Sequence, residues 1–434
     1  MAQDDDFFSE DDIFSDVETV IDVAEATDDT ILDVLTEEST TFSGLITANF
    51  GYVMTRDYFD DKSDWEENPY FTSMEGDFLL DVRLQKGIKA FADLWVAYTP
   101  QSATSSSEEE DENLWWPEDD GETMKMPDDD PLQTTLKEFF VDGNYKRRVY
   151  VRFGKQNLKW GRGYLWNPTD LISQDRKDFG DMDARREGVY GLKMHIPFGT
   201  TWNIYSFINA SGADKVDEFS YAGKVEVLLP QDIEMSVSAW KKKDYKAVFG
   251  LDFATHKFST DWRGEVSLSK GDNVSRLEKH NGRYVDVEND SDWTPRVALG
   301  FTRMFDHRDI NNRVSVTGEF YYNHAGYEDD MLGSDAIRDR FLEDGYFEPN
   351  NYGQYYAALF TSYNKFILSD MTLNVNAIGN LSDSSFMVSS GVTYGVINNL
   401  SLNCDVTGYL GSKNTEYTVM GDALGIDVSA TLAF

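Results

Sequence analysis

The stretch Arg147–Ser173, RRVYVRFGKQNLKWGRGYLWNPTDLIS, changes its pattern half-way along. In its first half, apolar residues such as Val151 and Phe153 alternate with polar residues such as Arg152, which is the period of a strand with one apolar and one polar face. The eleven residues from Trp160 onward hold two Trp, one Tyr, two Gly and an Asn-Pro pair, a composition that fits neither a strand nor a helix. The stretch therefore predicts a strand followed by a loop that folds inward from the end of that strand.

The same alternation recurs from Phe42 to the last residue. In the segment Ile88–Tyr98, for example, Lys89 and Asp93 oppose a row of apolar residues. When this pattern recurs around a closed sheet, the apolar side chains face lipid and the polar ones face a wet interior. An aromatic content of 14% with only 10 Pro also favours strands. The predicted fold class is therefore all-β, a transmembrane antiparallel β-barrel of about 18 strands (16 to 18) over residues 41–434, in a bacterial outer membrane.

The connections between the predicted strands alternate between tight and long. Tight turns are expected at Gly143-Asn144, Pro230-Gln231 and Asn398-Asn399. Because outer-membrane barrels have short periplasmic turns and long outer loops, the tight turns are predicted to face the periplasm. The predicted outer loops are residues 56–70, 101–131, 270–293, 325–351 and 411–422, and the predicted constriction or plug loop is 157–184.

The N-terminal residues 1–40 form a separate acidic arm, with fifteen acidic residues and no Lys or Arg in a chain of net charge -39. Their apolar residues recur with a spacing near 3.6, which predicts short helices or a disordered segment. One interpretation is a periplasmic arm that meets a partner protein, and the other is a solvated tail. Nucleic acid is not expected as a partner, because no basic surface is evident.

The last ten residues, GIDVSATLAF, form the most regular segment. Val428, Leu432 and Phe434 share one face, opposed by small and polar residues. This segment resembles the terminal strand that the barrel-assembly machinery recognises in bacterial outer-membrane proteins. The resemblance implies that the barrel-assembly machinery and outer-membrane lipids are partners of the chain.

Catalytic and metal sites are not predicted. His195 stands on a strand with no Ser or carboxylate placed beside it, although an acid, a base and a nucleophile must lie within reach of one another. The acidic outer loops do not contain the twelve-residue pattern of a calcium loop. We therefore expect no catalytic residue, no bound metal and no cofactor.

The stretch that begins at Arg147 carries the candidate functional residues. A row of basic residues is a local exception in so acidic a chain, and two interpretations are open. Basic side chains that face carboxylates across a lumen would select polar solutes by size and dipole. Alternatively, the arginines pair with Glu138, Asp142 or Asp183 and brace the loop. The residues expected to form or brace the constriction are Arg148, Arg152, Gln156, Trp160, Arg162, Tyr164, Trp166, Asn167 and Asp170.

Three short motifs in this stretch resemble a known signature. They are the R-x-G-x-Q run Arg152–Gln156, the pair Trp160-Gly161 and the N-P-x-D run Asn167–Asp170. Together they look like the signature of outer-membrane porins of the alginate-export type and of a related, uncharacterised barrel family found beside lipid exporters. The resemblance implies a monomeric barrel of about 18 strands with a loop folded into the lumen.

Three functions are compatible with this sequence. The favoured hypothesis is a porin-like channel for the diffusion of small polar solutes, including saccharides, through a lumen that the loop constricts. The second is a conduit for lipids or hydrophobic solutes that works with a periplasmic or inner-membrane exporter. The third is a surface adhesin with long acidic loops and a plugged barrel.

Overall fold

The computed structural model describes residues 37–55, 70–84, 87–100, 131–170, 172, 186–274, 276–280, 283–287, 292–328, 331–333, 338, 341–342 and 346–434. Most of the predicted acidic arm and of the predicted outer loops 56–70 and 101–131 lies outside the described residues. So do residues 173–185 of the predicted constriction loop, including Asp183.

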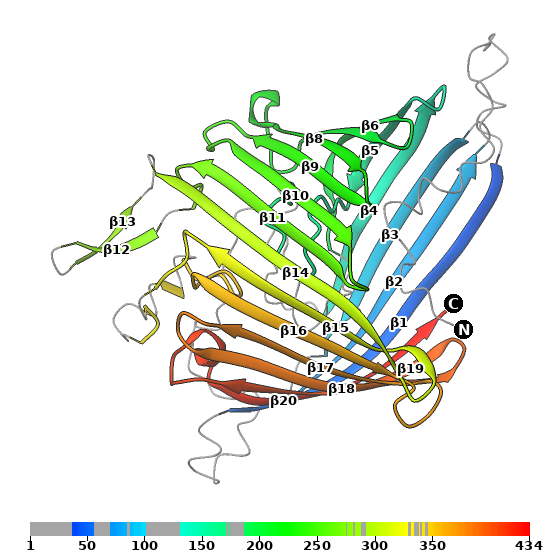
Figure 1. The fold of residues 1–434 in the computed structure, drawn as a ribbon. Coiled ribbons are helices and arrows are strands. Elements are labelled where there is room, and N and C mark those ends of the chain that lie inside the picture. Colours follow the sequence, from blue (N-terminus) through cyan, green and yellow to red (C-terminus); the bar gives the residue numbers. More distant parts are fainter. Residues whose placement is uncertain are drawn as a thin grey trace.

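Eighteen antiparallel strands form one closed barrel, because each pairs with its neighbours and β1 pairs with β20. This confirms the predicted fold class. Figure 1 shows the strands running obliquely around the barrel, with the small β12–β13 hairpin projecting from one rim. No helix in the described ranges is long and apolar enough to span a membrane.

The barrel strands are β1 (Glu37–Thr55), β2 (Tyr70–Leu84), β3 (Ile88–Tyr98), β4 (Leu132–Tyr145), β5 (Val149–Gln156), β6 (Val189–Phe198), β7 (Trp202–Asn209), β8 (Ser220–Leu229), β9 (Ile233–Lys241), β10 (Val248–His256), β11 (Asp261–Lys270), β14 (Trp293–His307), β15 (Ile310–Asn323), β16 (Tyr355–Asn364), β17 (Met371–Asn380), β18 (Ser385–Ile397), β19 (Leu400–Leu410) and β20 (Asp422–Ala433). The β12 (Arg276–His280) and β13 (Arg283–Val287) hairpin and the short 3-10 helices η3 (Val216–Glu218) and η4 (Glu416–Thr418) lie in connections.

The outer face of the barrel is apolar, as the alternation predicts. Phe153 and Val237 are 68% and 56% exposed although they stand in the middle of strands. At one end of the barrel Phe42, Phe78 and Phe434 form an aromatic group with ring centroids 5.8–6.5 Å apart. Side chains of this kind on the outside of a closed sheet fit a surface that faces lipid.

Two local features differ from the prediction. Gly143 and Asn144 lie inside β4, and the turn after it is made by Lys146 and Arg147, both with a φ of 53°. Two successive left-handed residues give a hairpin turn whose twist matches that of the strands, so the expected turn at Gly143-Asn144 is wrong. The β12–β13 hairpin lies within the predicted loop 270–293, where no strand was expected.

Candidate functional site: the loop inside the barrel

The chain that follows β5, residues 157–170, lies against the inner wall of the barrel. Trp160 is 2% exposed and packs in an apolar cluster with Phe207 of β7 and Ala222 of β8. Further along, the ring of Trp166 stacks on Tyr321 of β15, with centroids 5.4 Å apart and an interplanar angle of 11°. The prediction that this segment folds inward is therefore confirmed for its described residues.

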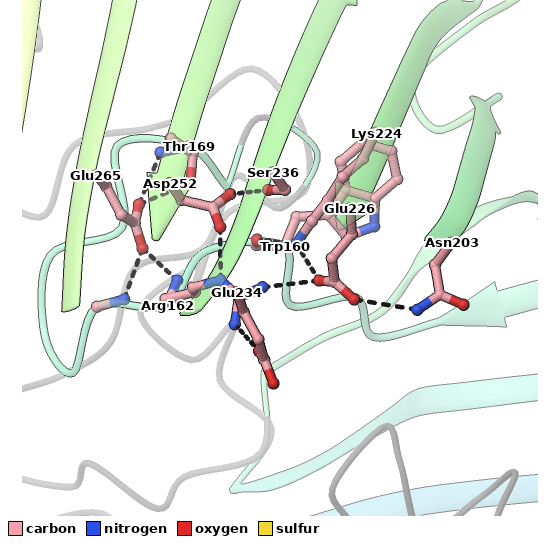
Figure 2. A network of polar contacts seen from close by, with 11 residues as sticks. Trp160, Arg162, Thr169, Asn203, Lys224, Glu226, Glu234, Ser236, Asp252 and Glu265 are labelled. Atoms are coloured by element: carbon pink, nitrogen blue, oxygen red, sulfur yellow. Dashed lines mark hydrogen bonds and ion pairs between the residues drawn. The ribbon is translucent and has the colours of Figure 1, made fainter. Parts of the chain in front are cut away.

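The carboxylate of Glu265, on β11, holds the first half of the loop. One of its oxygens accepts hydrogen bonds from the backbone N–H groups of Arg162 and Gly163, the latter at 2.6 Å. The other accepts from the backbone N–H of Thr169 at 3.0 Å and from its hydroxyl at 2.8 Å. Figure 2 shows this carboxylate with Thr169 and Arg162 around it. Hydrogen bonds to a charged acceptor are stronger than those between neutral groups, so one wall side chain fixes both ends of an eight-residue turn of the loop.

Glu319, on β15, holds the next part of the loop in the same way. Its Oε2 accepts from the N–H groups of Tyr164 and Leu165, at 2.7 and 3.2 Å, and its Oε1 accepts from the N–H of Trp166 at 2.7 Å. The side chain is only 4% exposed. A loop in the lumen cannot join a sheet, so its backbone donors need other partners, and the two carboxylates supply them.

Two glycines allow the loop backbone to approach these carboxylates. A Cβ on Gly163 would lie 1.9 Å from the carbonyl oxygen of Trp166. A Cβ on Gly161 would lie 2.6 Å from Oδ1 of Asn167 and 2.9 Å from Oε1 of Glu265. Both distances are shorter than any van der Waals contact, so this tight turn requires glycine at both positions.

The guanidinium of Arg162 is the charged centre of the site (Figure 2). Its Nε donates to Asp252 at 2.5 Å, and its two terminal nitrogens donate to Glu234 at 2.5 Å and to Glu226 at 2.8 Å. Lys224 stands beside this group, 3.8 Å from Glu226, and donates to the carbonyl oxygen of Trp160 at 2.9 Å. The planar fork of arginine can engage several carboxylates at once, so one loop residue ties together β8, β9 and β10.

Arg152 and Gln156 brace the base of the loop. Arg152 makes a bidentate ion pair with Asp142 of β4, at 2.7 and 2.9 Å, and its guanidinium lies 3.8 Å from the ring centroid of Phe140. Gln156 is fully buried and donates to the carbonyl oxygen of Gly191 at 3.2 Å. The ion pair with Asp142 is the one that the bracing interpretation expected.

The remaining candidate residues of the loop also contact its surroundings. The ring of Tyr164 meets Phe360 edge to face at 4.7 Å, and the amide of Asn167 donates to the carbonyl oxygen of Leu165 at 3.4 Å. Asp170 forms an ion pair with Arg186 at 3.4 Å. Trp166 donates from Nε1 to the carbonyl oxygen of Asn350 in the β15–β16 connection, at 2.8 Å.

Arg148 is not part of this site. It lies in the exposed turn between β4 and β5, at the end of β5 opposite to the loop. Its grouping with the constriction residues is therefore wrong, because the whole length of β5, Val149–Gln156, separates it from the loop. Val428 and Leu432 lie on the outward face of β20, and Phe434 follows that strand; all three side chains are exposed.

The wall carboxylates are the residues that sequence reasoning missed. Glu226, Glu234, Glu265 and Glu319 stand on the polar face of their strands, so their inward direction was predictable, but their attachment to the loop was not. The available signal was that acidic residues recur on successive strands while the loop offers glycines and an arginine. Asp252 was missed altogether.

A buried carboxylate in the β19–β20 connection supports the loop from the outer side. Glu416 accepts hydrogen bonds from the N–H of Asn350 at 2.5 Å, from the hydroxyl of Tyr356 at 2.8 Å and from the amide of Asn380 at 2.7 Å. Its own backbone N–H donates to Asp383 at 2.8 Å. Burial, opposed in part by these hydrogen bonds, raises the pKa of the Glu416 carboxyl to about 8.

The fold is shared with known channels, although the sequence is not. No protein-family profile matches the chain, and no curated protein matches it. The structure of Acinetobacter baumannii OccAB1 is similar with a TM-score of 0.54 at 10% identity, covering 92% of this chain and 97% of that one. The fold is that of the outer-membrane porins. A BenF-like porin from Pseudomonas fluorescens Pf-5 gives 0.54 at 11% identity, and Pseudomonas aeruginosa OpdK with vanillate gives 0.52 at 8%; each comparison covers 92% of this chain and 99% of the other.

Proposed function

We propose that this protein is a channel of the bacterial outer membrane through which small polar solutes diffuse. The observation that carries the proposal is a loop held by Glu265 and Glu319 inside a closed barrel of 18 strands with an apolar outer face. Such a loop narrows the lumen, and the charged side chains around it favour polar solutes over apolar ones. The solved structures of similar fold include channels of the Occ type and a BenF-like porin, which supports a role in solute passage.

The two other functions receive less support. A conduit for lipids would need an apolar inner surface, whereas the inner wall here carries Arg152, Lys224, Asp252, Glu265 and Glu319. An adhesin would act through its long outer loops. The interactions described above for residues 157–170 lie inside the barrel and do not point to that function.

The resemblance to porins of the alginate-export type rests on the motifs between Arg152 and Asp170. We propose that these motifs build the inward loop here. A solute as large and anionic as a polysaccharide is not part of the proposal, because Arg152 and Arg162 are paired with carboxylates. We further propose that the barrel-assembly machinery reads the strand that ends at Phe434, and that the acidic arm 1–40 meets a periplasmic partner.

Planar-bilayer recording tests the proposed function. The purified protein is expected to open steady ion-conducting channels, and replacing residues 160–180 by a short Gly-Ser linker is expected to raise the conductance of each channel several-fold. The matched control replaces the outer connection 210–219 by a linker of its own length and should leave the conductance unchanged. Channels whose conductance does not change when the loop is removed would show that the loop is not the constriction, and no conductance at all would contradict the channel itself.

A further inference from the structure

The described residues of the loop contact only part of the inner wall. In the described residues, hydrogen bonds and ion pairs of residues 158–170 reach β8, β9, β10, β11 and β15, the Asn350 backbone and Arg186, and none reaches β19, β20, β1 or β2. We call β7–β11 and β14–β16 the covered wall, and β19, β20, β1 and β2 the open wall. The apolar cluster around Trp166 touches the open wall only near the outer end of β19, at Tyr409. Apart from Tyr409, the described part of the loop therefore leaves the open wall without contacts.

Most inward residues of the open wall are small, polar or acidic; Leu45, Leu79 and Arg83 are exceptions, and Arg83 lies 3.7 Å from Asp81. Asp405 of β19 and Asp427 of β20 are directly paired in the strand register, so their side chains lie next to each other on the inner face. Glu75 of β2 stands lower on the same wall, opposite Thr47 of β1. All three carboxylates are at least partly exposed to the lumen.

The partners of these carboxylates are neutral. Glu75 accepts hydrogen bonds from the amide of Asn49 at 3.2 Å and from the hydroxyl of Ser73 at 3.3 Å. Asp405 accepts from the amide of Asn403. Within the described chain, no Lys, Arg or His nitrogen lies within 4.0 Å of Glu75, Asp405 or Asp427. An amide or hydroxyl stabilises the ionised carboxylate without cancelling its charge, so the three groups keep their field in the lumen.

The basic residues of the inner wall are placed differently. Arg152, Arg162 and Arg296 each have a carboxylate within 3.0 Å. An ion pair of this kind leaves little net field a few ångströms away, whereas an unpaired charge in a narrow lumen acts on every passing ion. Among the described residues, Arg263 of β11 has no carboxylate partner of this kind, but it belongs to the covered wall, where it donates to Thr302 and lies 5.6 Å from the ring centroid of the loop residue Tyr164. The unpaired charge at Glu75, Asp405 and Asp427 on the open wall is therefore negative.

We infer that the channel prefers cations and cationic solutes over anions, and that Asp405 and Asp427, with Glu75 below them, set this preference. The inference rests on the proposed channel function. A local potential of about -1 kT would favour a monovalent cation over a monovalent anion about sevenfold. Because the groups are exposed to the lumen, salt screens them, and the preference should fall between 0.1 M and 1 M salt, where the Debye length shortens from about 10 Å to about 3 Å.

The reversal potential in a KCl gradient at neutral pH measures this preference. For the full chain, the permeability of K⁺ is expected to exceed that of Cl⁻ by about three- to tenfold. In the double variant Asp405→Asn, Asp427→Asn the ratio should fall at least twofold toward one, and adding Glu75→Gln should lower it further. Asp405→Glu keeps the charge and should keep the ratio. Asp217→Asn is the matched control, because Asp217 lies exposed in η3, outside the barrel strands, and pairs with Lys243.

Ser429→Lys provides a second variant that does not remove a hydrogen-bonded carboxylate. Ser429 stands on the inner face of β20, paired with Asn49 and Asn403, two residues along the chain from Asp427. A lysine there should pair with Asp427 and lower the ratio as the double variant does. A wild-type ratio at or below one, or a ratio that none of these variants changes, would overturn the inference while leaving the channel in place. A protein that does not conduct at all would overturn both.

Discussion

The covered wall and the open wall use the same kind of strand and the same kind of acid for different purposes. On the covered wall, Glu265, Glu319 and Asp252 are buried and bind the backbone or the arginine of the loop. On the open wall, Asp427 is exposed and Asp405 is half-buried, and no Lys, Arg or His nitrogen of the described chain lies within 4.0 Å of either carboxylate. The difference shows that a carboxylate on the inner face of a barrel is structural where the chain supplies donors to it, and acts on solutes where it does not.

The largest expected effect comes from releasing the loop from the covered wall. In the double variant Glu265→Gln, Glu319→Gln, each site loses one acceptor oxygen and the charge that strengthens its hydrogen bonds. At about 1.5–3 kcal/mol for each hydrogen bond to a charged group, the loss amounts to several kcal/mol. We expect the loop to leave the wall, which would raise single-channel conductance and make the loop sensitive to protease.

Glu234→Gln is the matched control for the double variant. Glu234 belongs to the same wall, but its side chain is 50% exposed and, among the described residues, its hydrogen bond goes to the side chain of Arg162 and not to the loop backbone. The conductance and protease resistance of the Glu234→Gln variant should stay close to those of the wild type. Equal behaviour of the control and the double variant would show that the backbone hydrogen bonds do not hold the loop.

Most of the fold was predictable from the sequence. A period of two fixes which face of each strand is apolar, and the number and order of strands follow from how often this period recurs. The turn after β4 was misplaced because Lys146 and Arg147 take a left-handed conformation without being Gly or Asn, so the composition gave no signal. The β12–β13 hairpin was missed because its strands are only five residues long.

The site was predictable only in part. The composition of residues 160–170 indicated an inward loop, and the alternation of β4 and β5 placed Arg152 and Asp142 on one face. Contacts between the loop and β8–β15 join residues 64 to 155 positions apart, and no local pattern encodes such pairings. The alternation shows that Glu265 and Glu319 point inward, but only the course of the loop decides which donors they meet.

The second-largest effect is expected from removing the cation that the acidic residues of the covered wall share. Arg162→Met would leave Asp252, Glu226 and Glu234 close together without their shared cation. Removing one partner from a buried ion pair costs about 3–5 kcal/mol, so we expect a lower midpoint of unfolding in urea, followed by tryptophan fluorescence. The double variant Arg162→Met, Asp252→Asn should recover part of this loss, because it removes one of the three charges that repel one another. A double variant that is no more stable than Arg162→Met alone would assign the loss to packing.

A smaller effect is expected at the tight turn of the loop. Gly163→Ala places a methyl group where the carbonyl oxygen of Trp166 lies, so the turn must open by more than an ångström. The hydrogen bonds to Glu319 should lengthen, and the conductance of single channels should become noisier rather than larger. Gly143→Ala is the control, because a Cβ on Gly143 would meet nothing within 4 Å. The two variants should therefore differ clearly in current noise at the same voltage.

The smallest expected effect is a pH dependence that enters through the outer loops. Because the pKa of Glu416 is about 8 in the folded protein and near 4.5 for an ordinary glutamate, folding favours the protonated form. The stabilisation that comes from this protonated group is complete below about pH 4.5, declines as the pH rises, and is lost above about pH 8. Hydrogen exchange at the amide of Asn350, corrected for the intrinsic rate, should therefore be faster at pH 9 than at pH 6.

The change in stability at Asn350 should affect the constriction only weakly. The two are linked because the carbonyl oxygen of Asn350 accepts the hydrogen bond from Nε1 of Trp166. Glu416→Gln keeps a neutral side chain of the same size, so its exchange at Asn350 should not vary with pH beyond the intrinsic rate. The cation preference of the open wall should be the same at pH 6 and pH 9, because the hydrogen bonds of Glu416 go to Asn350, Tyr356, Asn380 and Asp383 and not to Asp405 or Asp427. A cation preference that follows the titration of Glu416 would mean that the two walls are coupled, and the separation between structural and solute-facing carboxylates would then fail.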